Sequence, residues 1–213
     1  GNTIIQSSAP VYFEEDMLTF TENEVFVDGG FFIGDTSEEF IKKVKNKYKK
    51  IYAFEPDEFV IKKVSSNLST AIETNKIEVI YKGLYDKNGF VKFVSTDRDF
   101  PSDGGTVLAD DIGEYSDNLI SISVTSIDEF FEDKTVDLQP TFIKMDIEGS
   151  EYNALIGAET TIKKYKPKLA ISVYHKPDDI YKLTKLIYNY NPNYTFTLRH
   201  YSSYMWDTVL FAY

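Results

Sequence analysis

The hydrophobic positions along this chain fall into short apolar runs separated by amphipathic stripes. Apolar runs bounded by polar residues predict strands, and stripes with a helical period predict helices. We expect strands at Val25–Val27, Ile51–Phe54, Glu78–Tyr81, Thr141–Met145 and Leu169–Tyr174, and helices at Thr36–Tyr48, near Phe59–Thr70, at Glu151–Tyr165 and at Asp178–Tyr190. Thr36 and Glu39 have capping-box spacing at the start of the first helix. This alternation predicts an α/β fold, in which a mostly parallel sheet carries helices on both faces.

Two regions depart from the alternation. Phe90–Ser95 and Ile120–Val124 have the pattern of antiparallel strands, and the polar, glycine-rich segment Asp97–Ser116 between them is a candidate lid loop. At the end of the chain, Thr195–Arg199 and Thr208–Ala212 predict a hairpin with a reversed last strand, which makes the sheet mixed.

No linker or internal repeat divides the sequence, so we expect a single domain over residues 1–213. Residues 1–23 are an N-terminal extension of that domain, and residues 90–124 are an antiparallel insertion. The first residue is Gly1 and not methionine, which leaves open a longer natural chain.

The charge of the chain narrows the choice of partners. It has 34 acidic and 23 basic residues and a net charge of -11. Nucleic acids and anionic membrane surfaces are polyanions, so we expect neither as a partner. The absence of cysteine excludes disulfides, a thiolate nucleophile and a zinc ribbon. No apolar run is long enough to span a bilayer and no signal peptide is visible, so we expect a cytoplasmic protein. Nothing in the sequence indicates the oligomeric state.

A glycine-rich turn follows the first strand in "VFVDGGFFIGDTS". Gly30 permits close approach of the backbone to a ligand, and Gly34 permits the turn into the helix. A dinucleotide would place its pyrophosphate there, but the carboxylate of Asp28 would oppose it by about 4 kcal/mol at about 4 Å and an effective dielectric constant of about 20. S-adenosylmethionine carries an ammonium and a sulfonium and no phosphate, so the sequence favours this cofactor.

The second and third strand ends add to this interpretation. Glu55 ends the second strand, about 20 residues after Gly34, where an acid typically accepts hydrogen bonds from a ribose diol. Pro56 stiffens the turn that follows. Gly83 and Leu84 follow the third strand, and they either flank an adenine ring or form a plain turn.

Three segments resemble the FkbM family of S-adenosylmethionine-dependent methyltransferases: "VFVDGGFFIGDTS", "IYAFEPD" and "FIKMDIEGSEYNALIGAE". The third is the most specific, because Ile143–Gly157 matches the family pattern I-K-x-D-[VI]-E-G-x-E-x-x-x-L-x-G. The resemblance runs from about Val25 to the C-terminus and implies the Rossmann-like class I methyltransferase fold, with a seven-stranded sheet that ends in a reversed hairpin. Phe31 stands where the family commonly has a small residue, which indicates a bulkier loop.

By this resemblance Asp28, Gly30 and Gly34 belong to the cofactor loop and Glu55 is the ribose acid. The predicted cofactor-binding residues are Asp28, Gly29, Gly30, Phe31, Gly34, Asp35, Thr36, Glu55, Pro56, Gly83, Leu84 and Asp146.

Chemistry for the transferred methyl group is expected at the fourth and fifth strand ends. Methyl transfer is an in-line displacement, which needs alignment and, for a hydroxyl acceptor, a base. Asp146, Glu148 and His175 are the predicted catalytic residues. Glu151 is more simply an acid that complements the helix dipole, and His200 is a weaker candidate than His175. Two metal ligands without a third are a weak indication of a metal site, so no metal is predicted.

The leading hypothesis is an O-methyltransferase that acts on a hydroxyl of a small molecule or sugar. One alternative is an accessory module that binds the nucleoside cofactor without turnover. The other is a nicotinamide-dependent oxidoreductase, which Asp28 disfavours. No G-x-S-x-G motif supports a hydrolase.

Overall fold

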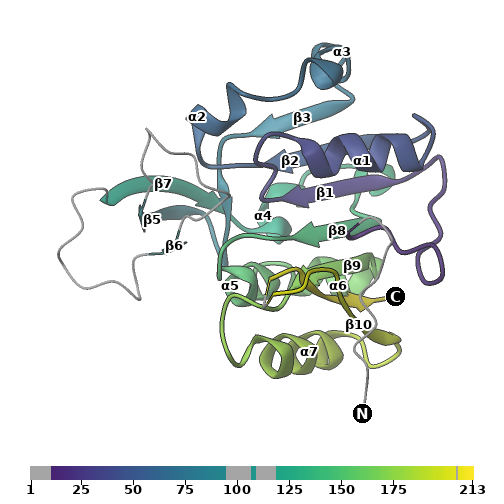
Figure 1. Ribbon diagram of the computed structural model, residues 1–213, viewed down its shortest axis with the longest axis vertical. Helices are drawn as coiled ribbons and strands as arrows, with labels where there is room; N and C mark the ends of the chain where they lie inside the picture. Colours follow the sequence, from purple (N-terminus) through teal and green to yellow (C-terminus); the bar gives the residue numbers. More distant parts are fainter. Residues whose placement is uncertain (1–10, 95–106, 109–118, 205) are drawn as a thin grey trace.

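The structure, a computed structural model, describes residues 11–94, 107–108, 119–204 and 206–213. Its central sheet has seven strands in the order β10-β11-β9-β8-β1-β2-β3. The strands are β1 (Val25–Gly29), β2 (Lys50–Phe54), β3 (Ile77–Ile80), β8 (Phe142–Met145), β9 (Lys168–Ser172), β10 (Phe196–His200) and β11 (Thr208–Ala212). Strand β11 is antiparallel to β9 and β10, whereas the other pairs are parallel. The predicted mixed sheet with a reversed hairpin strand is confirmed (Figure 1).

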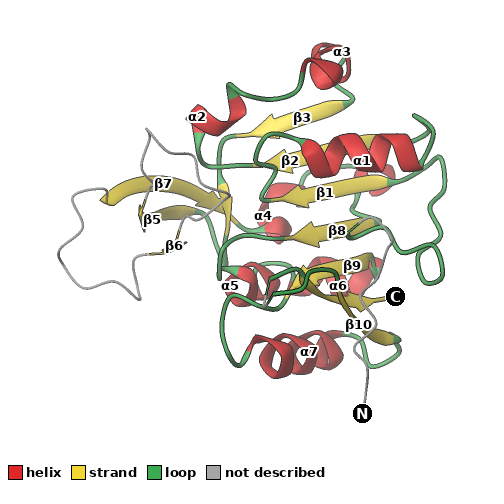
Figure 2. Cartoon of the chain, viewed as in Figure 1, coloured by secondary structure: helices red, strands yellow, loops and turns green. Residues whose placement is uncertain are grey.

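Helices cover both faces of the sheet (Figure 2). They are α1 (Asp35–Lys43), α2 (Glu58–Ile61), α3 (Ser69–Glu73), α4 (Ile127–Phe131), α5 (Glu151–Ile156), α6 (Glu159–Tyr165) and α7 (Asp179–Tyr190), with 3₁₀ turns at Ser66–Leu68 and Val136–Leu138. Side chains of α4, α5, α6 and α7 join one core cluster, and those of α1 and α3 join the other. Among the described residues, none of the helices has the length and apolar character that crossing a membrane requires.

Strands β1, β2 and β8 are buried along their whole length, since both faces of the sheet are covered there. In β1, Val25 and Val27 point into one core cluster and Phe26 into the other, as the alternation of side chains along a strand requires. The residues that precede β1 also enter the core. Phe13 is buried, and its ring centroid lies 6.1 Å from that of Phe142 and 6.4 Å from that of Phe26. The described part of the N-terminal extension is therefore packed against the sheet.

A second sheet of four strands, in the order β4-β7-β5-β6, is built around the predicted insertion. Its strands are β4 (Gly83–Leu84), β5 (Gly89–Val94), β6 (Val107–Leu108) and β7 (Leu119–Thr125). The antiparallel pairing of β5 with β7 is confirmed. Figure 1 shows both strands beyond the carboxyl ends of β1, β3 and β8. Of the candidate lid Asp97–Ser116, only β6 lies within the described residues.

The prediction of a single helix over Glu151–Tyr165 is wrong, because the chain forms two helices, α5 and α6, with a break at Gly157. A Cβ at Gly157 would lie 2.2 Å from the carbonyl oxygen of Tyr85, so the chain approaches the segment after β4 too closely here for any other residue. The carboxylate of Asp128 accepts hydrogen bonds from the amides of Thr160 and Thr161, both at 2.8 Å, and so caps the start of α6.

Two other predicted helices are also shorter than expected. In place of one helix near Phe59–Thr70, the chain forms α2, a 3₁₀ turn and α3, and the Ser65 side chain caps that turn. Helix α1 ends at Lys43, and not at Tyr48, because Lys45 and Asn46 adopt left-handed backbone conformations. The capping box was also wrong, since Gly34 is the N-cap and no side chain caps α1.

Candidate active site

The glycine turn after β1 lies against the end of β8. Gly30 has a φ of 77°, and a Cβ at this position would lie 1.9 Å from the carbonyl oxygen of Asp146. Only glycine fits both the conformation and the space. The amides of Gly30 and Phe31 both donate hydrogen bonds to the carbonyl of Phe54, at 3.1 and 3.0 Å, which ties the turn to β2. The first, second and fourth predicted strand ends therefore form one continuous surface.

Asp28 does not present an open negative charge to this surface. Its side chain is 0% exposed and accepts a hydrogen bond from the Ser37 hydroxyl at 2.6 Å. The ammonium of Lys144, which is 2% exposed, lies 3.2 Å from the other carboxylate oxygen and donates to the carbonyl of Gly30 at 2.8 Å. Burial raises the pKa of Asp28, and Lys144 and Ser37 oppose that rise. The electrostatic argument against a pyrophosphate is thus weaker than the sequence suggested, because Lys144 compensates the charge.

The remaining residues of the predicted cofactor loop have different environments. The side chain of Phe31 is fully buried in the core, so its ring does not crowd the outside of the turn. Asp35 is exposed and Thr36 half-buried in the first turn of α1. Gly29 is a buried residue of β1 and packs against Leu84. A Cβ at Gly29 would lie 2.8 Å from the Leu84 side chain.

Glu55 closes the turn from the second strand end. Its carboxylate accepts hydrogen bonds from the amides of Phe32 and Asp57, each at 3.0 Å, and the residue is 8% exposed. Burial raises the pKa of Glu55, and the two backbone donors oppose the rise. The half-buried Pro56 follows and lies 4.0 Å from the Cβ position of Gly83. The predicted residues of the second and third strand ends are therefore neighbours, as expected for the carboxyl edge of a parallel sheet.

Asp146 follows β8 and is held by two tyrosines. Tyr12 donates a hydrogen bond to one carboxylate oxygen at 2.8 Å, and Tyr174 donates to the other at 3.0 Å. The hydroxyl of Tyr12 also lies 3.3 Å from that of Ser172 on β9. Burial opposes ionisation of Asp146, but Lys144, His175 and the hydroxyl donors outweigh it and lower the pKa. Tyr12 was not among the predicted site residues, because nothing in a single N-terminal tyrosine signals a contact so distant in sequence.

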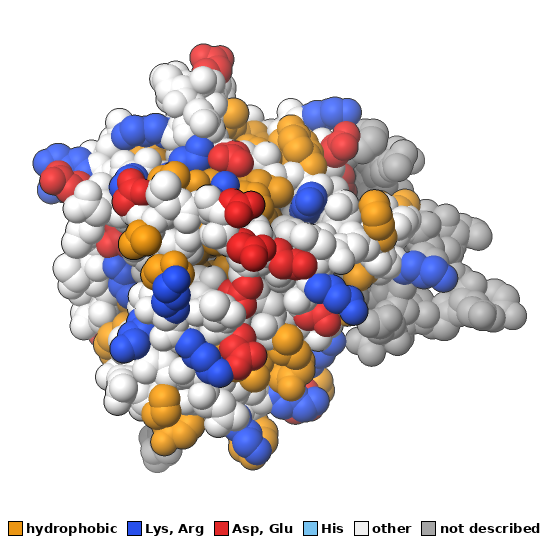
Figure 3. All heavy atoms as spheres, turned by 180° about the vertical axis from the view of Figure 1, so that it is seen from behind, with side chains coloured by type: hydrophobic (Ala, Val, Ile, Leu, Met, Phe, Trp, Pro, Cys, Tyr) orange, Lys and Arg blue, Asp and Glu red, His pale blue; other side chains and the backbone are white. Residues whose placement is uncertain are grey.

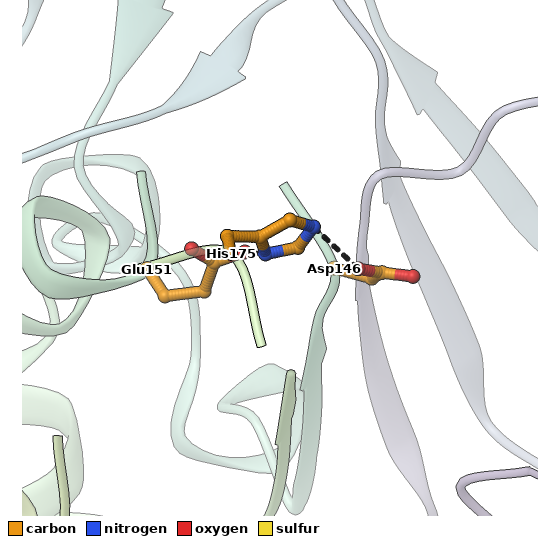
Figure 4. Close-up of side chains that lie close together, drawn as sticks. All are labelled: Asp146, Glu151 and His175. Atoms are coloured by element: carbon orange, nitrogen blue, oxygen red, sulfur yellow. Dashed lines mark ion pairs between the residues drawn. The ribbon is translucent and has the colours of Figure 1, made fainter. Parts of the chain in front are cut away.

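His175 lies among three carboxylates. Its Nδ1 is 3.0 Å from Glu151, and its Nε2 is 3.5 Å from both Asp146 and Glu148. Figure 4 shows the ring between Glu151 and Asp146. Burial alone would lower the pKa of His175, but Glu151 and the other two carboxylates raise it to about 9. The structure thus brings the three predicted catalytic residues together and adds Glu151, for which the sequence favours only a helix-start role.

The turn that follows Asp146 sets the position of the two glutamates. Glu148 and Gly149 have φ values of 55° and 90°, so two consecutive residues adopt the left-handed region. Such strain in a non-glycine residue is common at functional sites. Burial raises the pKa of Glu148 to about 7, opposed by His175 and assisted by Asp146 and Glu151. The carboxylate of Glu151 also accepts a hydrogen bond from the amide of Ile147 at 2.9 Å, which closes the turn.

The C-terminal hairpin places an aromatic side chain, Trp206, beside the candidate site, whereas its histidine, His200, lies elsewhere. His200 pairs with Thr208 across the hairpin, at 2.9 Å, and takes no part in the carboxylate cluster. The ring of Trp206 stands edge-on to that of Tyr174, with centroids 6.3 Å apart. Trp206 is exposed, so this part of the hairpin leaves an aromatic surface beside the residue that holds Asp146.

The face opposite to that of Figure 1 has acidic side chains grouped across its middle, with lysine and arginine side chains scattered around them (Figure 3). Among the described residues visible on that face, the basic side chains are dispersed.

Comparisons with solved structures identify the fold as that of the class I methyltransferases. The chain is similar to the methyltransferase FkbM of Methylobacillus flagellatus, with 34% identity, a TM-score of 0.74, and coverage of 95% of this chain and 47% of that one. It also resembles an rRNA methylase of Streptococcus thermophilus (15% identity, TM-score 0.50, 89% and 84% covered). A third similar structure is the fibrillarin of Aeropyrum pernix with natively bound S-adenosylmethionine (8% identity, TM-score 0.53, 90% and 66% covered). A comparison with curated proteins gives no match.

The profile of the methyltransferase FkbM domain matches residues 28–198. The chain therefore belongs to the FkbM methyltransferase family, as the three sequence segments predicted. It spans about half the length of the Methylobacillus protein.

Proposed function

We propose that the protein transfers the methyl group of S-adenosylmethionine to a hydroxyl group of a small molecule or sugar. The observation that carries this proposal is the contact between the Gly30 turn and Asp146, which joins the predicted cofactor loop to the catalytic cluster on one edge of the sheet. Membership of the FkbM family supports the reaction class.

The residues of the first three strand ends fit this cofactor. The Glu55 carboxylate is fixed by two backbone amides, so it has a defined orientation and retains lone pairs for a ribose diol. Gly30 has no side chain to obstruct the turn, and the half-buried Pro56 supplies an apolar contact for a flat base, with the buried Leu84 packed beneath Gly29. When bound, the cofactor supplies an electrophilic methyl group on a sulfonium.

The residues of the fourth and fifth strand ends are proposed to hold the acceptor. Of the three carboxylates around His175, that of Glu148 is the most exposed, at 32% of its side chain, against 25% for Asp146 and 1% for Glu151. Glu148 is therefore the group that an acceptor hydroxyl meets first, and we assign it the removal of the hydroxyl proton. His175, which also contacts Asp146, orients Glu148, and Tyr174 and Trp206 offer rings against which a sugar or an apolar acceptor packs.

Calorimetry of the purified chain with S-adenosylmethionine and S-adenosylhomocysteine tests the cofactor. We expect both to bind and NADH, the matched ligand control, not to bind. Absence of binding at millimolar S-adenosylmethionine, or preferential binding of NADH, would contradict the proposal.

The reaction is tested by incubation with S-adenosylmethionine and a set of hydroxylated small molecules and sugars. Mass spectrometry should detect an acceptor heavier by one methylene unit, together with S-adenosylhomocysteine. Glu148→Gln should reduce the rate strongly, whereas Glu132→Gln, at an exposed position after α4, should not. Cofactor binding without methylation of any acceptor would favour an accessory module in place of an enzyme.

A further inference from the structure

Asp146, Glu151 and His175 have the arrangement of metal ligands. Each offers one ligand atom, and the three atoms all lie within 4.8 Å of one another. Ligand atoms bonded to one ion at about 2.0–2.2 Å are at most about 4.4 Å apart. Small rotations of these side chains would therefore bring all three onto a single ion.

The fold, and not chance at the surface, creates this arrangement. Strands β8 and β9 are parallel neighbours, so their carboxyl ends deliver Asp146 and His175 to the same place. The left-handed turn at Glu148 and Gly149 then returns the chain so that Glu151, the first residue of α5, faces the imidazole.

Unpartnered buried atoms give an independent indication. The Glu151 side chain is 1% exposed, and its Oε2 has no hydrogen-bond partner among the described residues. Within the same part of the chain, neither ring nitrogen of His175 makes a hydrogen bond of acceptable geometry. Buried polar atoms normally have a partner, and an ion could serve the Glu151 carboxylate together with one ring nitrogen of His175.

The balance of charge points the same way. Three carboxylates surround one imidazole, and the buried ammonium of Lys144, which also favours the ionised form of Asp146, makes its ion pair with Asp28. An imidazolium and a lysine that is shared with Asp28 do not balance three ionised carboxylates in a partly buried site. A doubly charged cation would compensate them more fully.

We propose that Asp146, Glu151 and His175 form a binding site for one divalent transition-metal ion. A mixed set of one imidazole and two carboxylates suits Mn²⁺, Fe²⁺, Co²⁺ or Zn²⁺, whereas Ca²⁺ and Mg²⁺ prefer oxygen ligands alone. The ion site adjoins the Gly30 turn through Asp146. The role of the ion in the reaction, but not its binding, rests on the proposed function: in methyl transfer the ion would lie beside the acceptor and polarise its oxygen.

Binding is measured on the full chain, freed of any affinity tag and treated with EDTA, by calorimetry with Mn²⁺ and by the visible absorption of Co²⁺. We expect one ion per chain. The affinity for Mn²⁺ should fall about tenfold or more in Asp146→Asn, Glu151→Gln and His175→Gln, because each loses a ligand. The chain has two histidines, so His200→Gln is the matched control and should bind Mn²⁺ as the wild type does.

Two measurements need no variant. The melting temperature of the EDTA-treated wild type should rise with the concentration of Mn²⁺, because the ion binds the folded state. The electron spin echo of bound Mn²⁺ should show coupling to an imidazole nitrogen. Absence of binding at millimolar Mn²⁺ and Co²⁺, an unchanged affinity in His175→Gln, or an ion without nitrogen coupling would overturn the proposal.

These outcomes are independent of those for methyl transfer. Binding of S-adenosylmethionine to the EDTA-treated protein, without binding of any ion, would overturn the metal site alone. Binding of Mn²⁺ by a protein that has no affinity for S-adenosylmethionine would overturn the proposed function alone.

Discussion

The buried pair of Asp28 and Lys144 offers the sharpest test of how the glycine turn is held. Lys144→Met keeps the length of the side chain but removes the lysine that forms an ion pair with the fully buried carboxylate of Asp28. At 3.2 Å and an effective dielectric constant of about 20, the lost attraction is about 5 kcal/mol. Measured costs of removing one partner from a buried pair are about 3–5 kcal/mol. We therefore expect the free energy of unfolding to fall by about that amount.

Urea denaturation followed by circular dichroism measures this change. The double variant Asp28→Asn/Lys144→Met should recover much of the loss, because it leaves no isolated charge. Lys163→Met is the matched control, since it breaks the partly exposed pair with Glu159 on α6 and should cost at most about 1 kcal/mol. A loss in Lys144→Met no larger than that of the control would refute the reasoning.

The same variant should also respond to pH in a defined direction. Burial already raises the pKa of Asp28, and the removal of Lys144 raises it further. A carboxyl with a raised pKa binds its proton more tightly in the folded state, so its contribution to stability is lost as the pH rises above the unfolded value of about 3.9. The deficit of Lys144→Met should thus shrink as the pH falls. A deficit that grows on acidification would contradict this sign.

Three further changes probe the site. Glu55→Ala should lower the affinity for S-adenosylmethionine and for S-adenosylhomocysteine by the same factor, about tenfold or more by calorimetry, because both ligands carry the ribose diol. Unequal losses of affinity would contradict the assignment of Glu55 to the ribose. Gly30→Ala should lower stability by roughly 1–3 kcal/mol, since the added Cβ meets Asp146 and φ is positive, whereas Gly89→Ala, with open space around it, should not. Tyr12→Phe should cost about 1–3 kcal/mol in urea denaturation through the lost hydrogen bond to Asp146; an unchanged midpoint would show that this bond is unimportant.

The architecture could be predicted from the sequence because its signals are local. The first, second and fourth predicted strands are short apolar runs followed by an acid or a glycine, and the mixed sheet was expected from regular alternation and a final hairpin, although the order of its strands was not predicted. The break between α5 and α6 could not be predicted, because it depends on Tyr85 and Asp128, which meet Gly157 and α6 only in the folded chain. The helical spacing of apolar residues continues through Gly157, so the sequence pattern gives no sign of the break.

The electrostatics of the site were predicted less well than its location. Asp28, Glu55 and Asp146 all lie at the expected strand ends. However, the sequence shows a carboxylate without showing its counter-ion, and Lys144 appeared only as a strand residue. Glu151 was equally ambiguous, because an acid at a helix start stabilises the dipole whether or not it also faces a histidine.

The hydrogen bond from Tyr12 to Asp146 joins residues 134 positions apart in sequence. Closing a loop of this length costs entropy before any contact compensates it, which slows the formation of such long-range contacts. During synthesis, the residues around Tyr12 leave the ribosome long before β8 and β9 exist to receive them. The hydrogen bond that Tyr12 donates to Asp146 can therefore form only after β8 has been made, although Tyr12 is among the first of the described residues to be synthesised.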